Sequence, residues 1–356
     1  MSPKQNLAAA VLAGIAAMSM TARADNAPEE KTTVSGKAYL DFTNIRQDSD
    51  GVDSAATGTG VDVKRFYLGV THTFDDVWSA NVTSDFNYVS NDGQTQIYIK
   101  KAYLQAKLSD AFVARLGSAD LPWVPFVEDL YGYRYVENVL VDRLKFGTSA
   151  DWGLHAGGKF MDGKVNYAVS VINGAGYKNP TRSKSVDVEG RIGFAPIKGL
   201  TLAAGFYTGK LGKDVEASAT PALHTASRFT ALAAYVAPKF RVGAEYFTAD
   251  NWNQVTAAAT DKSDGFSGWG AFNFTDQVSA FARYDEAKPK KDLTPGLKDQ
   301  YYNVGVAYKP RKNVDIAFVY KHDKVENGTF ATSNGTIGGV ADGKFDEVGL
   351  WAQVVF

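Results

Sequence analysis

Residues 349–356 read GLWAQVVF, and they end the sequence on an apolar alternation. Apolar side chains stand at Leu350, Ala352, Val354 and Phe356, at every second position up to the last residue. A chain end is usually frayed and polar, whereas alternation with a period of two is typical of a β-strand. The stretch therefore predicts a final strand that a neighbouring strand holds in place up to Phe356.

The same alternation recurs along the chain. The clearest example is WSANVTSDFNYVS at residues 78–90, and VDVEGRIGF at 186–194 and VDIAFVYK at 314–321 repeat it. Such segments are about as long as the ~9–11 residues with which a tilted strand crosses a bilayer, and longer than the ~5–6 of an ordinary strand. A soluble β-sandwich also alternates, and it would be extracted without detergent. Strand length favours the membrane barrel.

The connections between these segments alternate between short and long. Asp162-Gly163 and Ala237-Pro238 mark tight turns, whereas the connections at 120–147 and 323–343 are long. Short turns at one end and long loops at the other are typical of an outer-membrane barrel. We expect an all-β, antiparallel transmembrane barrel of about sixteen strands. These are placed near residues 34–45, 63–74, 78–90, 96–108, 111–119, 147–160, 164–173, 185–195, 199–209, 227–237, 239–249, 264–274, 277–286, 300–309, 313–322 and 344–356.

The polar face of each strand is expected to line the barrel interior. Slipping segment 185–195 by one residue would turn Asp187, Glu189 and Arg191 toward lipid, where an arginine alone costs ~2–4 kcal/mol at the midplane. The strand that ends at Phe356 then closes the barrel against segment 34–45, which leaves no free edge. Aromatic residues also gather beside the turns, as expected of an interfacial girdle: Phe74, Trp78, Phe160, Phe194, Tyr235, Phe240, Phe274, Tyr308 and Phe356.

The first residues, MSPKQNLAAAVLAGIAAMSMTARAD, have the layout of a secretory signal. A charged start precedes an apolar run from Leu7 to Met20, and Ala22-Arg23-Ala24 supplies a cleavage sequence. We therefore expect residues 1–24 to be a cleaved signal peptide and residues 25–356 to form one barrel domain. A short helix that begins a cytosolic domain is the alternative interpretation.

Composition excludes several classes of function. The chain has no cysteine, and its net charge of −1 offers no electrostatic case for nucleic acid. Its four histidines are scattered, so we expect no metal site and no cofactor. The stretch DSDGVD at 48–53 looks slightly like a calcium-binding loop, but it lacks the glycine at position 6 and the glutamate at position 12 of an EF-hand, and a solvated turn is favoured. The run KPKK at 288–291 could contact lipopolysaccharide phosphates, but a solvated loop tip is the simpler interpretation.

Together these features resemble the sixteen-stranded porins of Gram-negative bacteria. The segments PFVEDLYGYRYVENVLVDR (125–143) and KFMDGKVNYAVSVING (159–174) resemble, more weakly, the group that includes the phosphate-selective porins O and P. The resemblance implies an outer-membrane homotrimer that contacts lipid and lipopolysaccharide and lets small hydrophilic solutes and ions diffuse passively. It also implies that the barrel-insertion machinery reads the strand ending at Phe356, and that the third long loop folds into the barrel.

That loop, DLPWVPFVEDLYGYRYVENVLVDRLKFG at 120–147, is too apolar and aromatic to lie in solvent. We expect an eyelet in which an acidic loop faces a basic wall, and the resulting field disfavours bulky apolar solutes. The predicted eyelet residues are Lys37, Arg65, Lys101 and Arg115 on the wall and Asp120, Glu128, Asp129, Arg134 and Glu137 on the loop. Alternatively, the loop caps its neighbours or packs on another subunit, and these charges merely solvate the lumen.

The other wall carries both signs of charge. Asp187, Glu189, Arg191, Arg241, Glu245, Arg283, Asp285 and Lys321 nearly balance, so we expect a weakly selective pore rather than a strongly phosphate-selective one. A hydrolase barrel and a receptor or adhesin barrel are the competing functions. No G-x-S-x-G or H-E-x-x-H motif supports the hydrolase. Intact ligand binding with blocked conductance would favour the receptor.

Overall fold

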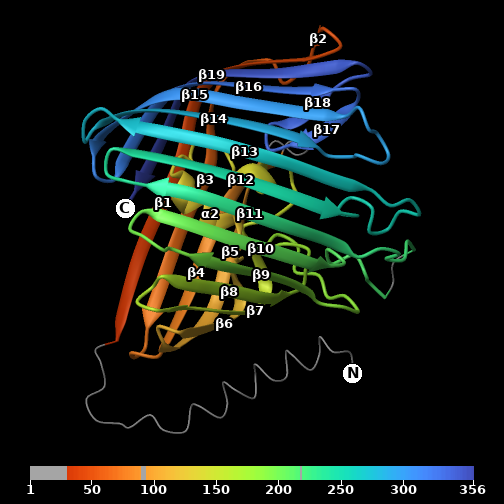
Figure 1. Ribbon diagram of the computed structural model, residues 1–356. Coiled ribbons are helices and arrows are strands. Elements are labelled where there is room, and N and C mark those ends of the chain that lie inside the picture. Colours follow the sequence, from red (N-terminus) through yellow and green to blue (C-terminus); the bar gives the residue numbers. More distant parts are fainter. Residues whose placement is uncertain (1–29, 90–93, 217–218) are drawn as a thin grey trace.

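The computed structural model describes residues 30–89, 94–216 and 219–356. In this part of the chain, sixteen antiparallel strands hydrogen-bond in sequence order and close on themselves (Figure 1). They are β1 Lys31–Ser49, β3 Gly58–Thr73, β4 Trp78–Val89, β5 Gln94–Ser109, β6 Phe112–Asp120, β7 Ala150–Phe160, β8 Val165–Ile172, β9 Asp187–Phe194, β10 Leu200–Gly209, β11 Ala226–Val236, β12 Phe240–Asp250, β13 Lys262–Asn273, β14 Val278–Lys288, β15 Lys298–Arg311, β16 Val314–Glu326 and β19 Asp342–Val355. The expected fold class is confirmed.

The smaller elements lie in the long connections. They are β2 Val52–Asp53, the hairpin of β17 Thr329–Thr332 and β18 Gly335–Gly338, and the helices α2 Val124–Tyr131 and α3 Leu140–Arg143. No helix in the described ranges is long and apolar enough to cross a membrane. The expected signal peptide, residues 1–24, lies outside the described residues and stays a prediction.

The last strand closes the barrel as expected. Lys37 of β1 faces Val355 of β19, and Gly36 and Phe356 exchange two backbone hydrogen bonds of 2.6 and 2.9 Å. The Phe356 ring covers Gly36 so closely that a Cβ there would lie 2.1 Å from a ring carbon. Pairing therefore continues to the final residue, which explains why the alternation does too.

Apolar side chains cover the outside of the barrel, and polar side chains face inward. Phe318 of β16 is 59% exposed, whereas the inward Lys321 of the same strand is 2% exposed. This orientation is the one expected from the cost of placing charges in lipid. It gives the barrel an apolar outer surface between its short-turn and long-loop ends.

Two long connections contain more strand than expected. β1 and β3 extend into the connection placed at 46–62, and β16, the hairpin and β19 occupy most of 323–343. Paired backbone satisfies its own hydrogen bonds in water as well as in lipid, so a ladder does not stop where the apolar face ends. Asp50 joins the two connections because its carboxylate accepts hydrogen bonds from three backbone N–H groups, at Val340, Ala341 and Asp342. These bonds hold the pKa of Asp50 below its usual range.

Candidate functional site

The segment between β6 and β7, residues 121–149, is hereafter called the inner loop. Helix α2 begins next to Pro125, which suits a first helical turn, and ends at Gly132, whose φ of 79° needs a residue without Cβ. Figure 1 shows α2 within the ring of strands. Helix α2 of this apolar segment is thus surrounded by the strands of the barrel.

The apolar side chains of the inner loop pack on the inner face of one half of the barrel. Tyr133 stacks on Phe281 of β14 with ring centroids 4.0 Å apart, and Phe146 lies 4.9 Å from Phe247 of β12. Trp123 is fully buried with them. Burial of such rings contributes roughly 1.5–3 kcal/mol each, so a dry core joins the loop to β10–β16 on this side.

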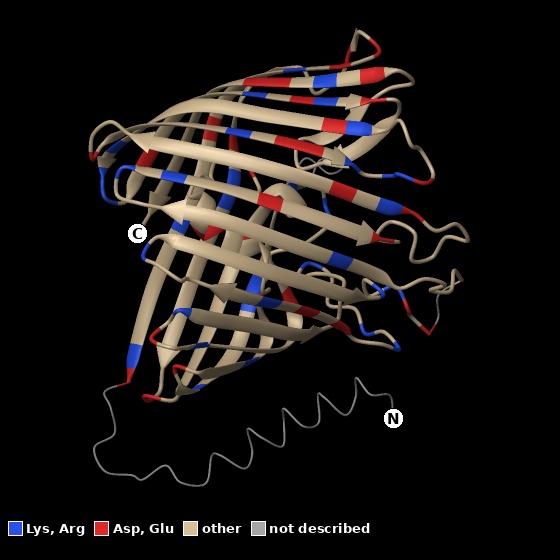
Figure 2. Ribbon diagram, in the orientation of Figure 1, with Lys and Arg blue, Asp and Glu red and all other residues tan. Residues whose placement is uncertain are grey.

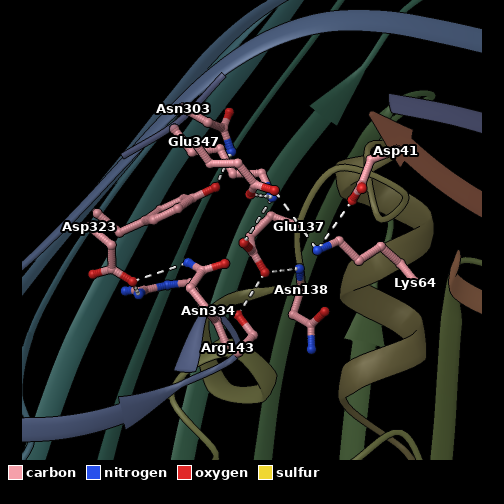
Figure 3. A network of polar contacts seen from close by, with 12 residues as sticks. Asp41, Lys64, Glu137, Asn138, Arg143, Asn303, Asp323, Asn334 and Glu347 are labelled. Carbon is pink, nitrogen blue, oxygen red and sulfur yellow. Dashed lines mark hydrogen bonds and ion pairs between the residues drawn. The ribbon is translucent and has the colours of Figure 1, made fainter. Parts of the chain in front are cut away.

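Arg143, from α3, is the most heavily bonded anchor of the inner loop. Its guanidinium binds three carboxylates on consecutive strands: Asp285 of β14 at 2.9 Å, Asp323 of β16 at 3.0 Å, and Asp299 of β15. All four side chains are fully buried. Figure 3 shows Arg143 and Asp323 within the larger polar network. Charge-assisted hydrogen bonds of this kind fix both position and orientation.

Strand arginines hold the backbone of the inner loop. Arg191, Arg241 and Arg283 donate to the carbonyl oxygens of Pro122, Leu130 and Asn138 at 2.8, 3.2 and 2.5 Å. In an irregular segment, many backbone carbonyl groups have no hydrogen-bond donor within the segment. The three guanidinium groups provide donors for these carbonyl oxygens.

A buried tryptophan at the start of the loop is tied to two strand carboxylates. The Trp123 indole donates to Glu245 Oε1 at 2.6 Å, and its backbone N–H donates to Glu189 at 2.9 Å.

These anchors correct the expected distribution of charge. Both signs lie on the strands of this wall (Figure 2), but six of the eight groups expected to line the water-filled lumen are 3% exposed or less: Asp187, Glu189, Glu245, Arg283, Asp285 and Lys321. They face inward as predicted, yet five of them bond to the inner loop. The sixth, Asp187, accepts from the Tyr207 hydroxyl and from the backbone N–H groups of Lys210 and Leu211. Their near balance of sign therefore says little about the water path.

The structure brings together some of the predicted eyelet residues. Lys101 of β5 pairs with Asp120 at 2.5 Å, and Arg134 pairs with Glu128 at 2.5 Å within the inner loop. Glu137 lies elsewhere. It is 4% exposed and contacts Lys321 of β16 at 3.5 Å, so it acts as an anchor on the far wall.

The other predicted eyelet residues form no ion pair with one another in the described part of the chain. Arg65 of β3 lies 3.7 Å from Asp85 of β4. Arg115 of β6 donates to Gln105 at 2.8 Å. Neither Lys37 nor Asp129 forms an ion pair among the described residues. The Asp129 side chain is exposed, and its carboxylate interacts electrostatically with the ammonium groups of Lys37 and Lys101.

Two wall lysines were missed because strict alternation assigns them to the lipid face. Lys64 lies at a bulge where β3 shifts register against β1, and Lys100 lies at a similar bulge where β5 shifts against β4. A bulge lets adjacent residues share a face, so Lys64-Arg65 and Lys100-Lys101 all point inward. Two adjacent basic residues within one strand could have indicated each bulge, because without a bulge one of the two would face lipid.

The inward direction of both lysines is visible in their contacts. Lys64 Nζ lies 3.2 Å from Asp41 of β1, beside Glu347 of β19 (Figure 3). Lys100 Nζ donates to the Tyr67 hydroxyl at 3.3 Å and lies 4.5 Å from the centre of that ring.

Above these groups the barrel encloses a cavity of about 970 Å³. Its walls come from β3, from the inner loop and from the connections after β8 and β10, and they include Arg65, Arg134, Tyr177 and Lys213. The cavity also borders the inner loop and inward residues of the opposite strands, among them Glu189 of β9, Tyr207 of β10 and Lys321 of β16.

Comparison with solved structures identifies the architecture. No protein-family model and no curated protein matches the chain. An anion-selective porin from Comamonas acidovorans superposes with a TM-score of 0.69 at 11% identity, covering 92% of this chain and 100% of that one. The outer-membrane channel DcaP of Acinetobacter baumannii gives 0.64 at 13%, covering 92% and 98%. Salmonella typhi OmpF gives 0.62 at 13%, again covering 92% and 98%. This is the fold of the outer-membrane porins.

Within this porin barrel, Asp129 provides a test of the eyelet by pH. The protein around Asp129 displaces part of its hydration although the side chain still reaches solvent, and this desolvation raises the pKa of Asp129. The neighbouring carboxylate of Glu128 raises that pKa further. As the pH falls toward the acidic range, Asp129 is therefore expected to lose its charge before an ordinary aspartate does, and the current should shift toward anions. An Asp129→Asn variant should show the shifted selectivity already at neutral pH. Reversal potentials between pH 7 and 4 measure this, and equal profiles for variant and wild type would contradict it.

Proposed function

We propose that the protein is an outer-membrane channel through which small hydrophilic solutes and ions diffuse passively. The observation that carries the proposal is the one-sided anchoring of the inner loop. Its apolar face packs against β10–β16. The exposed carboxylate of Asp129 lies on the other side, within electrostatic range of Lys37 on β1 and Lys101 on β5 and without an ion pair to either among the described residues. Sixteen strands enclose more room than side chains fill, so this arrangement supports a narrowed, water-filled path rather than a plugged barrel.

The proposal extends to location and assembly. A cleaved signal peptide would deliver the chain for export, and the insertion machinery would read the strand ending at Phe356. In the membrane we expect a homotrimer in contact with lipopolysaccharide. One similar structure is described as a trimer form of OmpT, an outer-membrane protein of Vibrio cholerae. We propose no catalytic role, since most of the inward charges on β9–β16 are engaged in holding the inner loop.

The chain has no cysteine, which permits a direct test. In planar bilayers, the purified Asp129→Cys variant should conduct, and a bulky thiol-reactive reagent should then lower the conductance of each open channel. Asp276→Cys, at a short turn outside the barrel wall, is the matched control and should not respond. No conductance from the unmodified protein would refute the channel. Conductance that the reagent leaves unchanged would refute narrowing at the inner loop.

A further inference from the structure

The cavity at the long-loop end is lined by both acidic and basic side chains, and the two kinds differ in how many of them have a partner within the protein. Its acidic lining residues are Asp62, Glu137, Asp142, Asp151 and Glu189, and its basic ones are Lys64, Arg65, Arg134, Lys145, Lys178, Lys213 and Lys321. By count, the basic lining residues slightly outnumber the acidic ones. What decides the field in the cavity is which of these groups already has a partner of opposite charge or a full set of hydrogen bonds.

Each acidic group is engaged by the protein itself. Glu137 lies 3.5 Å from Lys321. Asp142 accepts from Asn138 Nδ2 at 2.7 Å and lies 3.7 Å from Arg134.

The remaining acids of the cavity are held in the same way. Asp151 accepts three backbone N–H groups at 2.7 to 3.1 Å. Glu189 pairs with Arg228 at 3.2 Å, and Asp62 lies 3.9 Å from Lys64. No acidic group on the cavity wall is thus left without a partner in the described residues.

Three of the lysines are different. Lys145, Lys178 and Lys213 are exposed to the cavity and form no ion pair in the part of the chain that the structure describes. Lys178 Nζ lies only over the face of the Tyr98 ring, 4.6 Å from its centre. An ammonium in this situation keeps N–H donors free for a solute.

A fourth unpaired ammonium stands behind the wall. Lys100 is 9% exposed, forms no ion pair among the described residues, and has one hydrogen bond, to the Tyr67 hydroxyl. Its Nζ also lies 5.7 Å from the centre of the Tyr177 ring, and Tyr177 lines the cavity. Burial disfavours the charged form of a lysine, so the three exposed lysines, rather than Lys100, account for most of the positive potential of the cavity.

We propose that this cavity gathers and transiently binds small anions with carboxylate or phosphate oxygens, and that the channel therefore prefers anions over cations. The inference rests on the proposed channel function. Free ammonium groups in a recess with walls of low dielectric constant concentrate anions, and conduction requires such binding to be favourable but weak. The two bulges also set Arg65 and Lys101 beside Lys64 and Lys100 on the inner face, but Arg65 and Lys101 already have carboxylate partners in Asp85 and Asp120.

The test is the reversal potential of single channels of the full chain in planar bilayers under a potassium chloride gradient. We expect a chloride-to-potassium permeability ratio above one. The variant Lys145→Gln/Lys178→Gln/Lys213→Gln should lower that ratio about twofold or more. The control Lys262→Gln/Lys288→Gln/Lys290→Gln removes equal charge from residues at the same end of the barrel that do not line this cavity. It should leave the ratio unchanged.

Inorganic phosphate and acetate, added in turn at the long-loop side, test binding. Reduction of the chloride current by both supports a site for oxyanions in general, and reduction by phosphate alone narrows it to phosphate. Either reduction should weaken in the cavity variant. Conducting channels with a permeability ratio of one or below would overturn the inference and leave the channel intact. Absence of any conductance would overturn the channel itself.

Discussion

Replacing Arg143 with methionine should release the inner loop and give a larger and noisier single-channel conductance. Methionine has a similar volume but no charge, so Asp299 and Asp323 would remain buried without a cation, while Asp285 would keep Arg283 at 2.6 Å. Breaking a buried pair by removing one partner typically costs ~3–5 kcal/mol. The side chain is fully enclosed, so water cannot compensate without moving the loop.

The control for Arg143 is an exposed arginine in an ion pair. Arg46 lies 3.5 Å from Asp53 with most of its side chain in solvent, and pairs of that kind contribute about 0–1 kcal/mol. Arg46→Met should therefore leave conductance and thermal stability unchanged. The triple variant Arg143→Met/Asp299→Asn/Asp323→Asn removes the uncompensated carboxylates and should recover part of the stability. Wild-type conductance and stability in Arg143→Met would show that other contacts alone hold the loop.

Much of the fold was predictable because a lipid-facing strand allows few alternatives. The expected facing of β9, with Glu189 and Arg191 inward, agrees with their contacts to Trp123 and Pro122. A shift of one residue would have placed those charges in lipid. The ends of β1, β3 and β16 were less predictable. Beyond the lipid layer the outer face of a strand need not be apolar, so the alternation that marks the strand stops there, although backbone pairing continues.

The candidate site was predictable in kind but not in detail. The composition of residues 120–147 indicated an inserted loop, and Lys101 does meet Asp120. Alternation cannot reveal which inward positions the loop will cover, so Glu245 and Asp285 were assigned to the water path. A register count also cannot anticipate a bulge. Lys100 was therefore missed although its neighbour Lys101 was found.

Placing an arginine on the outer face at mid-barrel should prevent efficient folding in lipid. Val304 of β15 is 51% exposed and stands between Ala282 of β14 and Tyr320 of β16. Near the middle of the strand, Val304→Arg should cost ~2–4 kcal/mol, because the guanidinium enters hydrocarbon. The midpoint of urea unfolding in phospholipid vesicles measures the effect.

The matched control is Leu293→Arg, in the connection between β14 and β15. Leu293 is 45% exposed, a fraction similar to that of Val304. It lies beyond the strand ends, however, where water solvates an added charge. Its effect on stability should stay within about 0.5 kcal/mol. The two residues are similar in size, polarity and accessibility, so only the surrounding medium separates them. Equal unfolding midpoints for the two variants would mean that the apolar exterior does not face lipid at Val304. A large difference would place the hydrocarbon layer at that level of the barrel.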